Sequence, residues 1–322
     1  MFALLKNLLK FVFYLLLFIF LLVTLVPYFF SLKNKELSTT EKPYDNSSYL
    51  IRDEFFMHYR TFHPEKVKHK IILLPGFSGS TFSYHHMFDS LISNQCMVVA
   101  VDIPPFGFSV KNNDLHYTDT LILTMIRQIM NQTDSSLNSE QPWIIAGHSL
   151  GVNYVAKMVS RYPDLFTKQV YIDGYYFGNP KSNWNKFALY PPLMKGADVL
   201  LEKYYLSEEK FAELLESAYG RKATVEEVSA YKKPFEYAHS GSSVLKWASA
   251  DPCVKVNPDI VYKKPTLVIW GRKDTWVPFN EEDFNIKAFD AITFKMIDSA
   301  GHIPQETHPK EVSEILINFI RN

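Results

Sequence analysis

A serine stands between two glycines in the stretch Gly147–Gly151, which reads GHSLG. The apolar run Trp143–Ala146 precedes it and a helical pattern begins at Val152, so a sharp turn from a strand into a helix is expected. A serine on such a turn has a strained backbone and needs small residues two positions away, which the glycines supply. The turn also presents the hydroxyl at a helix N-terminus, where amide groups stabilise negative charge. Only 12 of the 322 residues are glycine, so the motif in this context favours a nucleophilic Ser149 over an ordinary glycine-rich turn.

A nucleophilic serine needs a base to take its proton and an acid to orient that base. On a turn of this kind the partners follow in the order serine, acid, histidine. Among ten histidines, His302 fits best because it follows the last predicted strand, whereas His308 is expected to begin a helix and to cap it. Asp274 lies just after a buried apolar run, and Asp173 is the alternative acid. The sequence therefore predicts catalytic roles for Ser149, Asp274 and His302.

Two backbone amide groups are required to stabilise the oxyanion that forms when a serine attacks a carbonyl carbon. One is predicted to be that of Leu150, the residue directly after Ser149. The other is predicted to be that of Phe77, in the glycine-containing loop Pro75–Gly79 that follows the apolar run Ile71–Leu74. These glycines would also suit a plain turn, but their coincidence with the serine motif favours the functional interpretation.

Short apolar runs alternate with helical patterns through most of the chain. Continuous apolar strands are buried on both faces, as in a parallel sheet, and strand–helix alternation indicates a doubly wound α/β sheet. Strands are expected within 48–62 and at 71–74, 97–101, 143–146, 170–172, 266–270 and 292–297. Helices are expected at 83–92, 118–131, 150–162, 280–288 and 309–320.

The alternation breaks over residues 178–248, where the sheet needs no strand. One helix is expected from Ser207 to near Gly220, and Thr224 and Glu227 form a possible capping box for a second. The segment is rich in aromatic residues, most of which are expected to pack it against the core while a minority line a pocket. An insertion at this point would cover the carboxyl ends of the strands, where open α/β sheets bind ligands. The segment is therefore predicted to be a helical cap.

Residues 11–30 carry no charge and are apolar throughout. A helix of about 20 such residues spans about 30 Å, the thickness of the hydrocarbon core of a bilayer. A core helix would be amphipathic, and a cleaved signal peptide would have a shorter apolar region and a small-residue cleavage site. Residues 1–32 are thus predicted to be a retained single-pass membrane anchor, followed by a linker over 33–47. Lysines flank the apolar run on both sides, so the orientation in the membrane stays open.

Charge and cysteine content argue against other classes of function. The 34 basic and 34 acidic side chains cancel, so no global field attracts nucleic acid or a strongly acidic partner. No cluster of cysteines and histidines suggests a metal site, and no cofactor is implied. Cys96 and Cys253 could form one disulfide, but two buried thiols are favoured. The oligomeric state is not predicted.

The motifs together resemble those of the α/β-hydrolase superfamily, in particular its capped lipases and esterases, which include monoacylglycerol lipases with an N-terminal membrane helix. The resemblance covers about residues 50–320 and is carried by PGFSGS, VDIPPFGFS, GHSLG, IWGRKD and GHIPQETHP. It implies an α/β-hydrolase fold whose core, over 48–177 and 249–322, is interrupted by the cap. Three positions depart from the pattern: Pro75 replaces a histidine, and Pro105 and Val152 replace glycines.

The predicted function is hydrolysis of a lipophilic carboxylic ester, of the monoacylglycerol or lysophospholipid type, through an acyl-enzyme. The same triad would also serve an acyltransferase, a C–C bond hydrolase or a lactonase, because a fold does not settle a reaction. A non-catalytic membrane-anchored binding protein is the remaining alternative, and the intact set of candidate residues disfavours it. Haloalkane dehalogenases and epoxide hydrolases of the superfamily carry aspartate at the position of Ser149, which argues against both.

Overall fold

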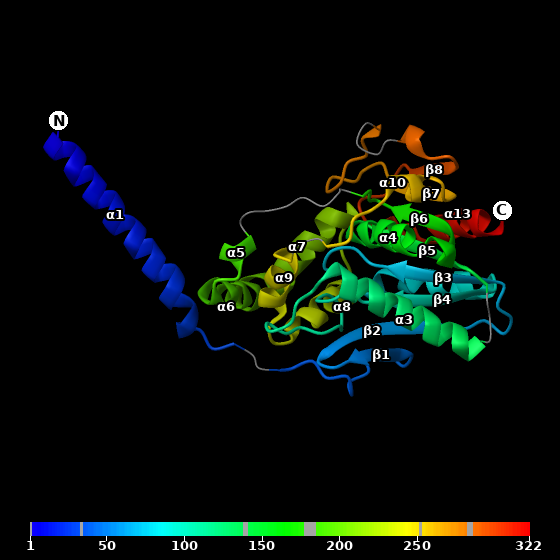
Figure 1. Ribbon diagram of the computed structural model, residues 1–322, viewed down its shortest axis with the longest axis horizontal. Helices are drawn as coiled ribbons and strands as arrows, with labels where there is room; N and C mark the ends of the chain where they lie inside the picture. Colours follow the sequence, from blue (N-terminus) through cyan, green and yellow to red (C-terminus); the bar gives the residue numbers. More distant parts are fainter. Residues whose placement is uncertain (1, 33–34, 138–140, 177–184, 251–252, 282–285) are drawn as a thin grey trace.

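The computed structural model of the protein describes residues 2–32, 35–137, 141–176, 185–250, 253–281 and 286–322. A central sheet carries helices on both faces, and a group of helices covers one end of the strands (Figure 1). A long N-terminal helix extends away from these elements (Figure 1).

Eight strands form the sheet, in the order β1-β2-β4-β3-β5-β6-β7-β8. β2 is antiparallel to both of its neighbours, and all other pairs are parallel. β4, β5 and β7 are buried along their whole length, which explains their continuous apolar sequences. The predicted doubly wound α/β sheet is therefore confirmed. The strands are β1 (Ser47–Arg52), β2 (Phe55–Phe62), β3 (His69–Leu74), β4 (Cys96–Val101), β5 (Trp143–His148), β6 (Phe166–Ile172), β7 (Thr266–Gly271) and β8 (Ile292–Ile297).

Two hydrophobic clusters hold helices against the two faces of the sheet. On one face α3 (Asp119–Leu137) and α4 (Leu150–Arg161) bury their apolar sides. On the other face α2 (Phe88–Ser93) and α13 (Pro309–Arg321) do the same. Each fully buried Val, Leu or Ile in these clusters contributes about 1.5–3 kcal/mol relative to an exposed one, so the sheet is a rigid platform for its loops.

Two of the expected helices differ from the prediction. The helix expected at 83–92 is α-helical only in its second half, because the chain enters it through the 3-10 helix η2 (Thr81–Met87). In the helix expected at 280–288, residues 282–285 lie outside the described residues. Its described end forms the short 3-10 helix η6 (Ile286–Ala288).

The helices between β6 and β7 form an insertion, which we define as residues 185–248. Local capping sets two of its helices as the sequence predicts. Ser207 accepts a hydrogen bond at the start of α7, Gly220 ends it in the left-handed region (φ 69°), and Thr224 and Glu227 cap α8 reciprocally. The elements are α5 (Asn185–Ala188), α6 (Pro191–Leu200), the π-helix η4 (Leu201–Tyr205), α7 (Glu208–Tyr219), α8 (Val225–Lys232), η5 (Lys233–Glu236) and α9 (Ser240–Ala248), and the short α10 (Pro258–Tyr262) follows them.

The N-terminal helix α1 (Phe2–Leu25) continues into the 3-10 turn η1 (Val26–Phe29). The stretch Leu4–Phe29 is long and apolar enough to cross a membrane, and its side chains are exposed. Its C-terminal end contacts the insertion, where Tyr190 stacks on Phe20 and hydrogen-bonds to Thr24 at 3.1 Å. The helix is therefore attached to the insertion at one end only (Figure 1).

The polar segment expected to be a linker also contacts the insertion. The carbonyl oxygen of Lys35 accepts a hydrogen bond from the amide of Ala238 at 2.8 Å. Glu41 accepts one from the hydroxyl of Tyr237 at 2.9 Å. The described part of this segment thus lies fixed along the insertion before β1 begins at Ser47.

Candidate active site

The turn between β5 and α4 holds Ser149 in a strained backbone conformation, with φ 49° and ψ −118°. Its amide donates to the carbonyl oxygen of Ile172 at 2.9 Å, which fastens the turn to β6. A Cβ atom on Gly147 would lie 2.6 Å from the carbonyl carbon of Gly151, and one on Gly151 would lie 2.3 Å from the carbonyl oxygen of Leu74. Both contacts are too short for any side chain, so the turn requires both glycines.

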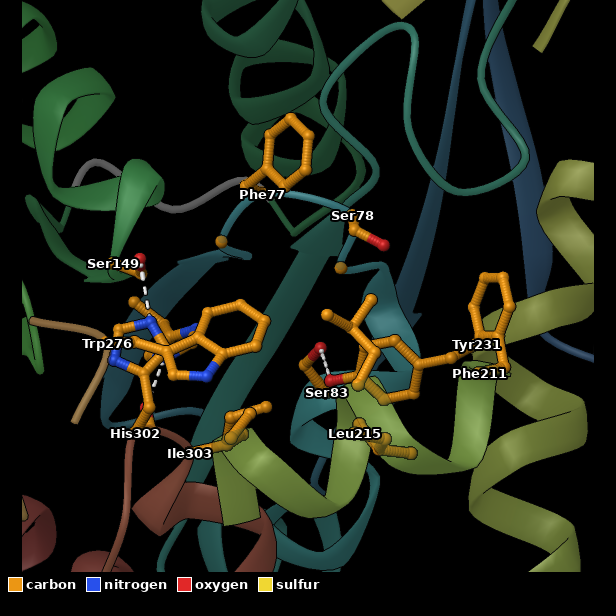
Figure 2. A pocket seen from close by; sticks show the side chains of 15 residues that line it. Phe77, Ser78, Ser83, Ser149, Phe211, Leu215, Tyr231, Trp276, His302 and Ile303 are labelled. Carbon is orange, nitrogen blue, oxygen red and sulfur yellow. Dashed lines mark hydrogen bonds between the residues drawn. The ribbon is translucent and has the colours of Figure 1, made fainter. Parts of the chain in front are cut away.

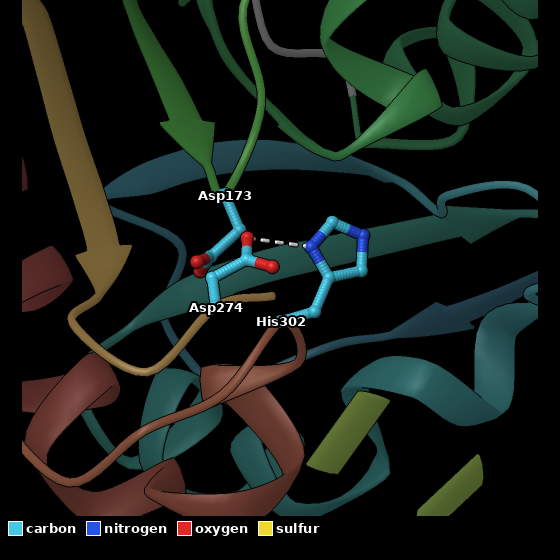
Figure 3. Close-up of side chains that lie close together, drawn as sticks. All are labelled: Asp173, Asp274 and His302. Atoms are coloured by element: carbon cyan, nitrogen blue, oxygen red, sulfur yellow. Dashed lines mark hydrogen bonds and ion pairs between the residues drawn. The ribbon is translucent and has the colours of Figure 1, made fainter. Parts of the chain in front are cut away.

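The structure brings Ser149, His302 and Asp274 into one hydrogen-bonded line. The hydroxyl of Ser149 donates to Nε2 of His302 at 3.0 Å (Figure 2). Nδ1 of His302 donates to Oδ2 of Asp274 at 2.8 Å (Figure 3). The amides of Trp276 and Val277 both donate to Oδ1 of Asp274, at 2.8 and 2.9 Å, which fixes the carboxylate. This pattern assigns the proton of the neutral imidazole to Nδ1 and leaves Nε2 free to accept from the serine.

Contacts from three directions hold the histidine in place. Its amide donates to the carbonyl oxygen of Ala218 in α7 at 2.8 Å. Its carbonyl oxygen accepts from Nε2 of His148 at 2.7 Å; burial lowers the pKa of His148 to about 3, so that ring is neutral. Its ring stacks on that of Trp276 with centroids 5.5 Å apart, and the Trp276 indole donates to Oγ of Ser217 at 3.1 Å.

Asp173, the alternative acid, lies beside Asp274 (Figure 3), but the hydrogen bond from Nδ1 of His302 goes to Asp274. Asp173 is fully buried, and its Oδ1 accepts from the amide of Gly271 at 2.8 Å. Burial and the neighbouring Asp274 carboxylate raise its pKa well above the ordinary value, so it is held neutral. One group of side chains among the described residues could hold a metal ion by distance, with potential ligand atoms within 4.8 Å of one another. It consists of Asp173, Asp274 and His302. The bond between Asp274 and His302 already occupies two of those atoms.

The two predicted oxyanion donors lie on either side of Ser149, Leu150 in helix α4 and Phe77 in the loop after β3. Leu150 is the first residue of α4, and the first amides of a helix have no partner within it. Phe77 follows Gly76, where a Cβ would lie 3.1 Å from the Cβ of Ser149, so this loop passes close to the nucleophile. The Phe77 ring is half exposed and packs on Phe106 at 5.0 Å.

A cavity of about 340 Å³ opens in front of Ser149 and His302 (Figure 2). α7 and α8 of the insertion supply one wall, and the loops after β3 and β7 supply others. Most of its lining is apolar, which suits a hydrophobic ligand. The lining residues are Gly76, Phe77, Ser78, Gly79, Ser83, His148, Ser149, Phe211, Leu214, Leu215, Ala218, Tyr231, Trp276, His302 and Ile303.

A polar cluster interrupts this lining at the side away from Ser149 (Figure 2). The hydroxyl groups of Ser83 and Tyr231 lie 2.9 Å apart. Behind them the buried carboxylate of Glu306 accepts hydrogen bonds from Tyr231 and, at 2.5 Å, from Tyr219. Burial raises the pKa of Glu306 to about 7, although the two tyrosine hydroxyls oppose this shift.

A second serine–histidine–aspartate array lies among β1, β2 and the loop after β4. The hydroxyl of Ser47 and Nε2 of His58 are 2.8 Å apart, and Nδ1 of His58 and Oδ2 of Asp102 are 2.7 Å apart. All three side chains are buried, and none is among the described residues that line the cavity. Asp102 also accepts from the amides of Thr81 and Phe108, at 2.6 and 2.7 Å. This array therefore fastens the loop after β4 to the sheet.

Several residues around the site were not predicted from the sequence. His148 and Glu306 lie within the motifs GHSLG and GHIPQETHP, but the motifs do not indicate their contacts, and Trp276 and Ser83 lie outside the quoted motifs. Trp276, His148, Ser83 and Glu306 acquire their positions only through tertiary packing. His308 does stand at the start of α13, but its ring does not cap that helix. Its ring nitrogens lie within hydrogen-bond distance of the hydroxyls of Ser299 and Thr307 instead.

Both cysteines are free, so they form no disulfide. Cys96 is buried in β4, as expected for a structural thiol. Cys253 is exposed, so the expectation of two buried thiols is wrong for this residue. It lies in the chain segment that returns from the insertion to the core, with its Sγ 3.3 Å from the hydroxyl of Thr120.

Comparison with known proteins agrees with this architecture. The family described as "alpha/beta hydrolase fold" matches residues 70–309. An uncharacterised hydrolase of Bacillus subtilis, YugF, is 24% identical over 260 residues, which cover 78% of this chain and 89% of the relative. A putative esterase/lipase of Mycoplasma genitalium is 25% identical over 265 residues, covering 81% and 92%.

Solved structures with the same fold include two bacterial proteins. One is a membrane phospholipase A, with a TM-score of 0.62, 16% identity and coverage of 100% of both chains. The other is a probable hydrolytic enzyme of Pseudomonas aeruginosa, with a TM-score of 0.68, 16% identity and coverage of 90% and 99%. The family match spans most of the sheet and both sides of the insertion. The chain therefore belongs to the α/β-hydrolase family and is an enzyme of the hydrolase class.

Proposed function

We propose that the protein is a serine esterase that uses Ser149 as nucleophile, His302 as base and Asp274 as the acid that orients the base. The observation that carries this proposal is the line of two hydrogen bonds, 3.0 and 2.8 Å long, at the wall of an apolar cavity. A serine on a strained turn, an imidazole within hydrogen-bond distance of it and a fixed carboxylate are the parts that acyl transfer requires.

The mechanism follows from the direction of these hydrogen bonds. Oγ of Ser149 attacks the ester carbonyl carbon while its proton passes to Nε2 of His302, and the amides of Phe77 and Leu150 stabilise the oxyanion. The intermediate collapses, the C–O bond to the alcohol breaks, and the alcohol leaves with the proton from His302. Water then attacks the acyl-enzyme with His302 again as base, which releases the carboxylic acid and restores the serine.

The substrate we propose is a lipophilic carboxylic ester of the monoacylglycerol or lysophospholipid type. The apolar lining of the cavity favours an acyl chain over a polar substrate. The apolar helix α1, attached to the insertion through Tyr190, would hold the enzyme at a membrane in which such esters dissolve. The insertion would then act as the cap that the sequence predicts over residues 178–248, between the membrane and the site.

The test uses the full-length protein in detergent micelles and a panel of monoacylglycerols, lysophospholipids and short-chain esters. We expect release of fatty acid by the wild type, a preference for longer acyl chains, and labelling by a fluorophosphonate probe. Ser149→Ala should abolish both release and labelling. Equal activity of the two proteins would refute the proposal, and products formed only with an added alcohol acceptor would identify an acyltransferase instead.

A further inference from the structure

Of the described residues in the polar cluster, two border the cavity. Ser83 and Tyr231 line the cavity, whereas Tyr219 and Glu306 lie behind them. The remaining wall on that side includes the apolar Phe211 and a second serine, Ser78. Ser83 is almost fully buried, so its hydroxyl faces the cavity and the cluster rather than bulk solvent.

The carboxylate fixes the direction of the hydrogen bonds in this cluster. An ionised carboxylate only accepts, so Tyr231 and Tyr219 each donate their one hydroxyl hydrogen to Glu306. Ser83 then donates its own hydrogen into the cluster, to the oxygen of Tyr231 or to Glu306, whose carboxylate it also stabilises. The Ser83 oxygen is left with lone pairs and no hydrogen for a molecule in the cavity. It therefore presents an acceptor to the ligand.

We propose that Ser83, oriented by Tyr231 and Glu306, is the acceptor of a subsite that binds a hydroxyl group of the substrate. This inference rests on the proposed function and deepens it, because it restricts the substrate class to esters that carry a hydroxyl group away from the scissile carbonyl. Figure 2 shows Ser83 and Tyr231 on the other side of the cavity from Ser149 and His302. A substrate that reaches both must also fill the apolar space between them.

The same cluster joins the insertion to the core, but this structural role does not explain why Ser83 is part of it. Tyr219 ends α7, Tyr231 belongs to α8, and Glu306 belongs to the short α12 (Pro304–Thr307). A structural joint would explain the bonds to Glu306. It would not explain a serine hydroxyl in an apolar cavity wall, where a buried polar atom raises the free energy unless it is fully hydrogen-bonded. A ligand hydroxyl would satisfy the free lone pairs of Ser83.

The first experiment compares substrates on the full-length wild type at pH 8, above the pKa of Glu306, so that the carboxylate is ionised. One arm compares a 1-monoacylglycerol with the propyl ester of the same acid, which places the hydroxyl in the alcohol part. The second arm compares methyl esters of a hydroxy fatty acid and of the unsubstituted acid, which places it in the acyl part. Each arm includes the O-methylated analogue, which can accept a hydrogen bond but cannot donate one.

In one of the two arms we expect kcat/KM to be about tenfold higher for the hydroxylated ester, the effect of one net hydrogen bond. The O-methylated analogue should behave like the ester without a hydroxyl. The arm that shows the preference identifies which part of the substrate occupies the subsite. Hydrolysis of all esters without any preference in either arm overturns this inference and leaves the proposed function intact. Hydrolysis of none of them refutes the proposed function itself.

Two matched pairs of variants localise the preference. Ser83→Ala should remove it, whereas Ser78→Ala, which deletes another serine hydroxyl from the same cavity lining, should keep it. Tyr231→Phe and Tyr219→Phe each remove one donor to Glu306, but only Tyr231 borders the cavity. We expect the first to weaken the preference and the second to keep it. Equal loss in both tyrosine variants, or retention in Ser83→Ala, would show that the cluster is only a structural joint.

Discussion

Two serine–histidine–aspartate arrays with nearly the same geometry occupy different regions of this molecule. In the first, Ser149, His302 and Asp274 are joined by hydrogen bonds of 3.0 and 2.8 Å. In the second, the corresponding distances among Ser47, His58 and Asp102 are 2.8 and 2.7 Å. Side-chain types and distances alone therefore do not distinguish a candidate catalytic site from a structural one.

The surroundings of the two serines do distinguish them. Ser149 lines a cavity, sits on a turn with φ 49°, and precedes the first turn of a helix. Ser47 is buried in β1, and its Oγ accepts a hydrogen bond from the amide of Tyr44 at 3.1 Å. A carbonyl carbon can approach the first hydroxyl but not the second, and only the first has helix amides nearby to stabilise an oxyanion. Access and oxyanion stabilisation, more than the three side chains, make the difference.

The largest expected effect comes from removing the histidine of each array. His302→Ala should lower kcat/KM by about 10,000-fold or more, because the nucleophile loses its base. His58→Ala should instead lower the free energy of unfolding by about 3 kcal/mol, since it leaves a cavity and a buried carboxylate without its partner. Ester hydrolysis and thermal unfolding of both variants check this. A large loss of activity per folded molecule in His58→Ala would contradict the assignment of the second array to a structural role.

The second-largest expected effect is the loss of activity on replacing the aspartate that orients His302. Asp274→Asn should reduce kcat/KM by about 1,000- to 10,000-fold, because an amide favours the wrong tautomer of the histidine. Asp173→Asn is the matched control from the same cluster. Its carboxyl group is already held neutral by burial and by Asp274, so a neutral amide of similar shape should change kcat/KM by less than about threefold. Steady-state kinetics on one ester substrate measure both, and similar losses would assign the orienting role to both acids.

Glu306 is a further buried carboxyl group, and its partners are tyrosine hydroxyls instead of a histidine. Its folded-state pKa of about 7 lies above the ordinary value of 4.5, so the folded state retains the proton that the unfolded state loses. Its contribution to stability is full below pH 4.5 and is lost as the pH rises to about 7, by on the order of 3 kcal/mol. Unfolding at pH 5 and pH 8 should show this loss in the wild type and a smaller one in Glu306→Gln. Parallel pH dependence of the two proteins would contradict it.

The smallest expected effect concerns the buried serine. Ser47→Ala should lower the free energy of unfolding by about 1 kcal/mol, because one net hydrogen bond is lost. Activity and fluorophosphonate labelling should stay at the wild-type level. Mass spectrometry of the labelled peptide provides the check, and any label on Ser47 would show that the second array is also reactive.

The sequence predicted the parts of the site that depend on local patterns. GHSLG marks Ser149 because the turn excludes side chains at both glycines, and the structure shows those close contacts. Asp274 and His302 follow from their order in the chain and from the strands that precede them, and continuous apolar runs mark the buried strands such as β7. Each of these features depends on a few residues that are neighbours in the chain. A single sequence was therefore enough to predict them.

Features that depend on distant residues could not be predicted. Ser47, His58 and Asp102 come from three elements, and no spacing in the chain links them. The positions of Trp276 and Glu306 follow from the packing of the insertion on the core, which has no local signature. The exposure of Cys253 likewise depends on how the chain returns from the insertion.

The end of α7 has a mechanical consequence for the enzyme. Ala218 accepts the amide hydrogen of His302, and Ser217 accepts the indole hydrogen of Trp276, the ring on which that histidine stacks. An outward movement of α7 would break both hydrogen bonds. It would therefore free His302, the proposed base, from its position. If substrate entered and product left the cavity without a movement of α7, His302 would keep its hydrogen bonds throughout the reaction. The helix that forms one wall of the cavity therefore also holds the residue proposed as the base.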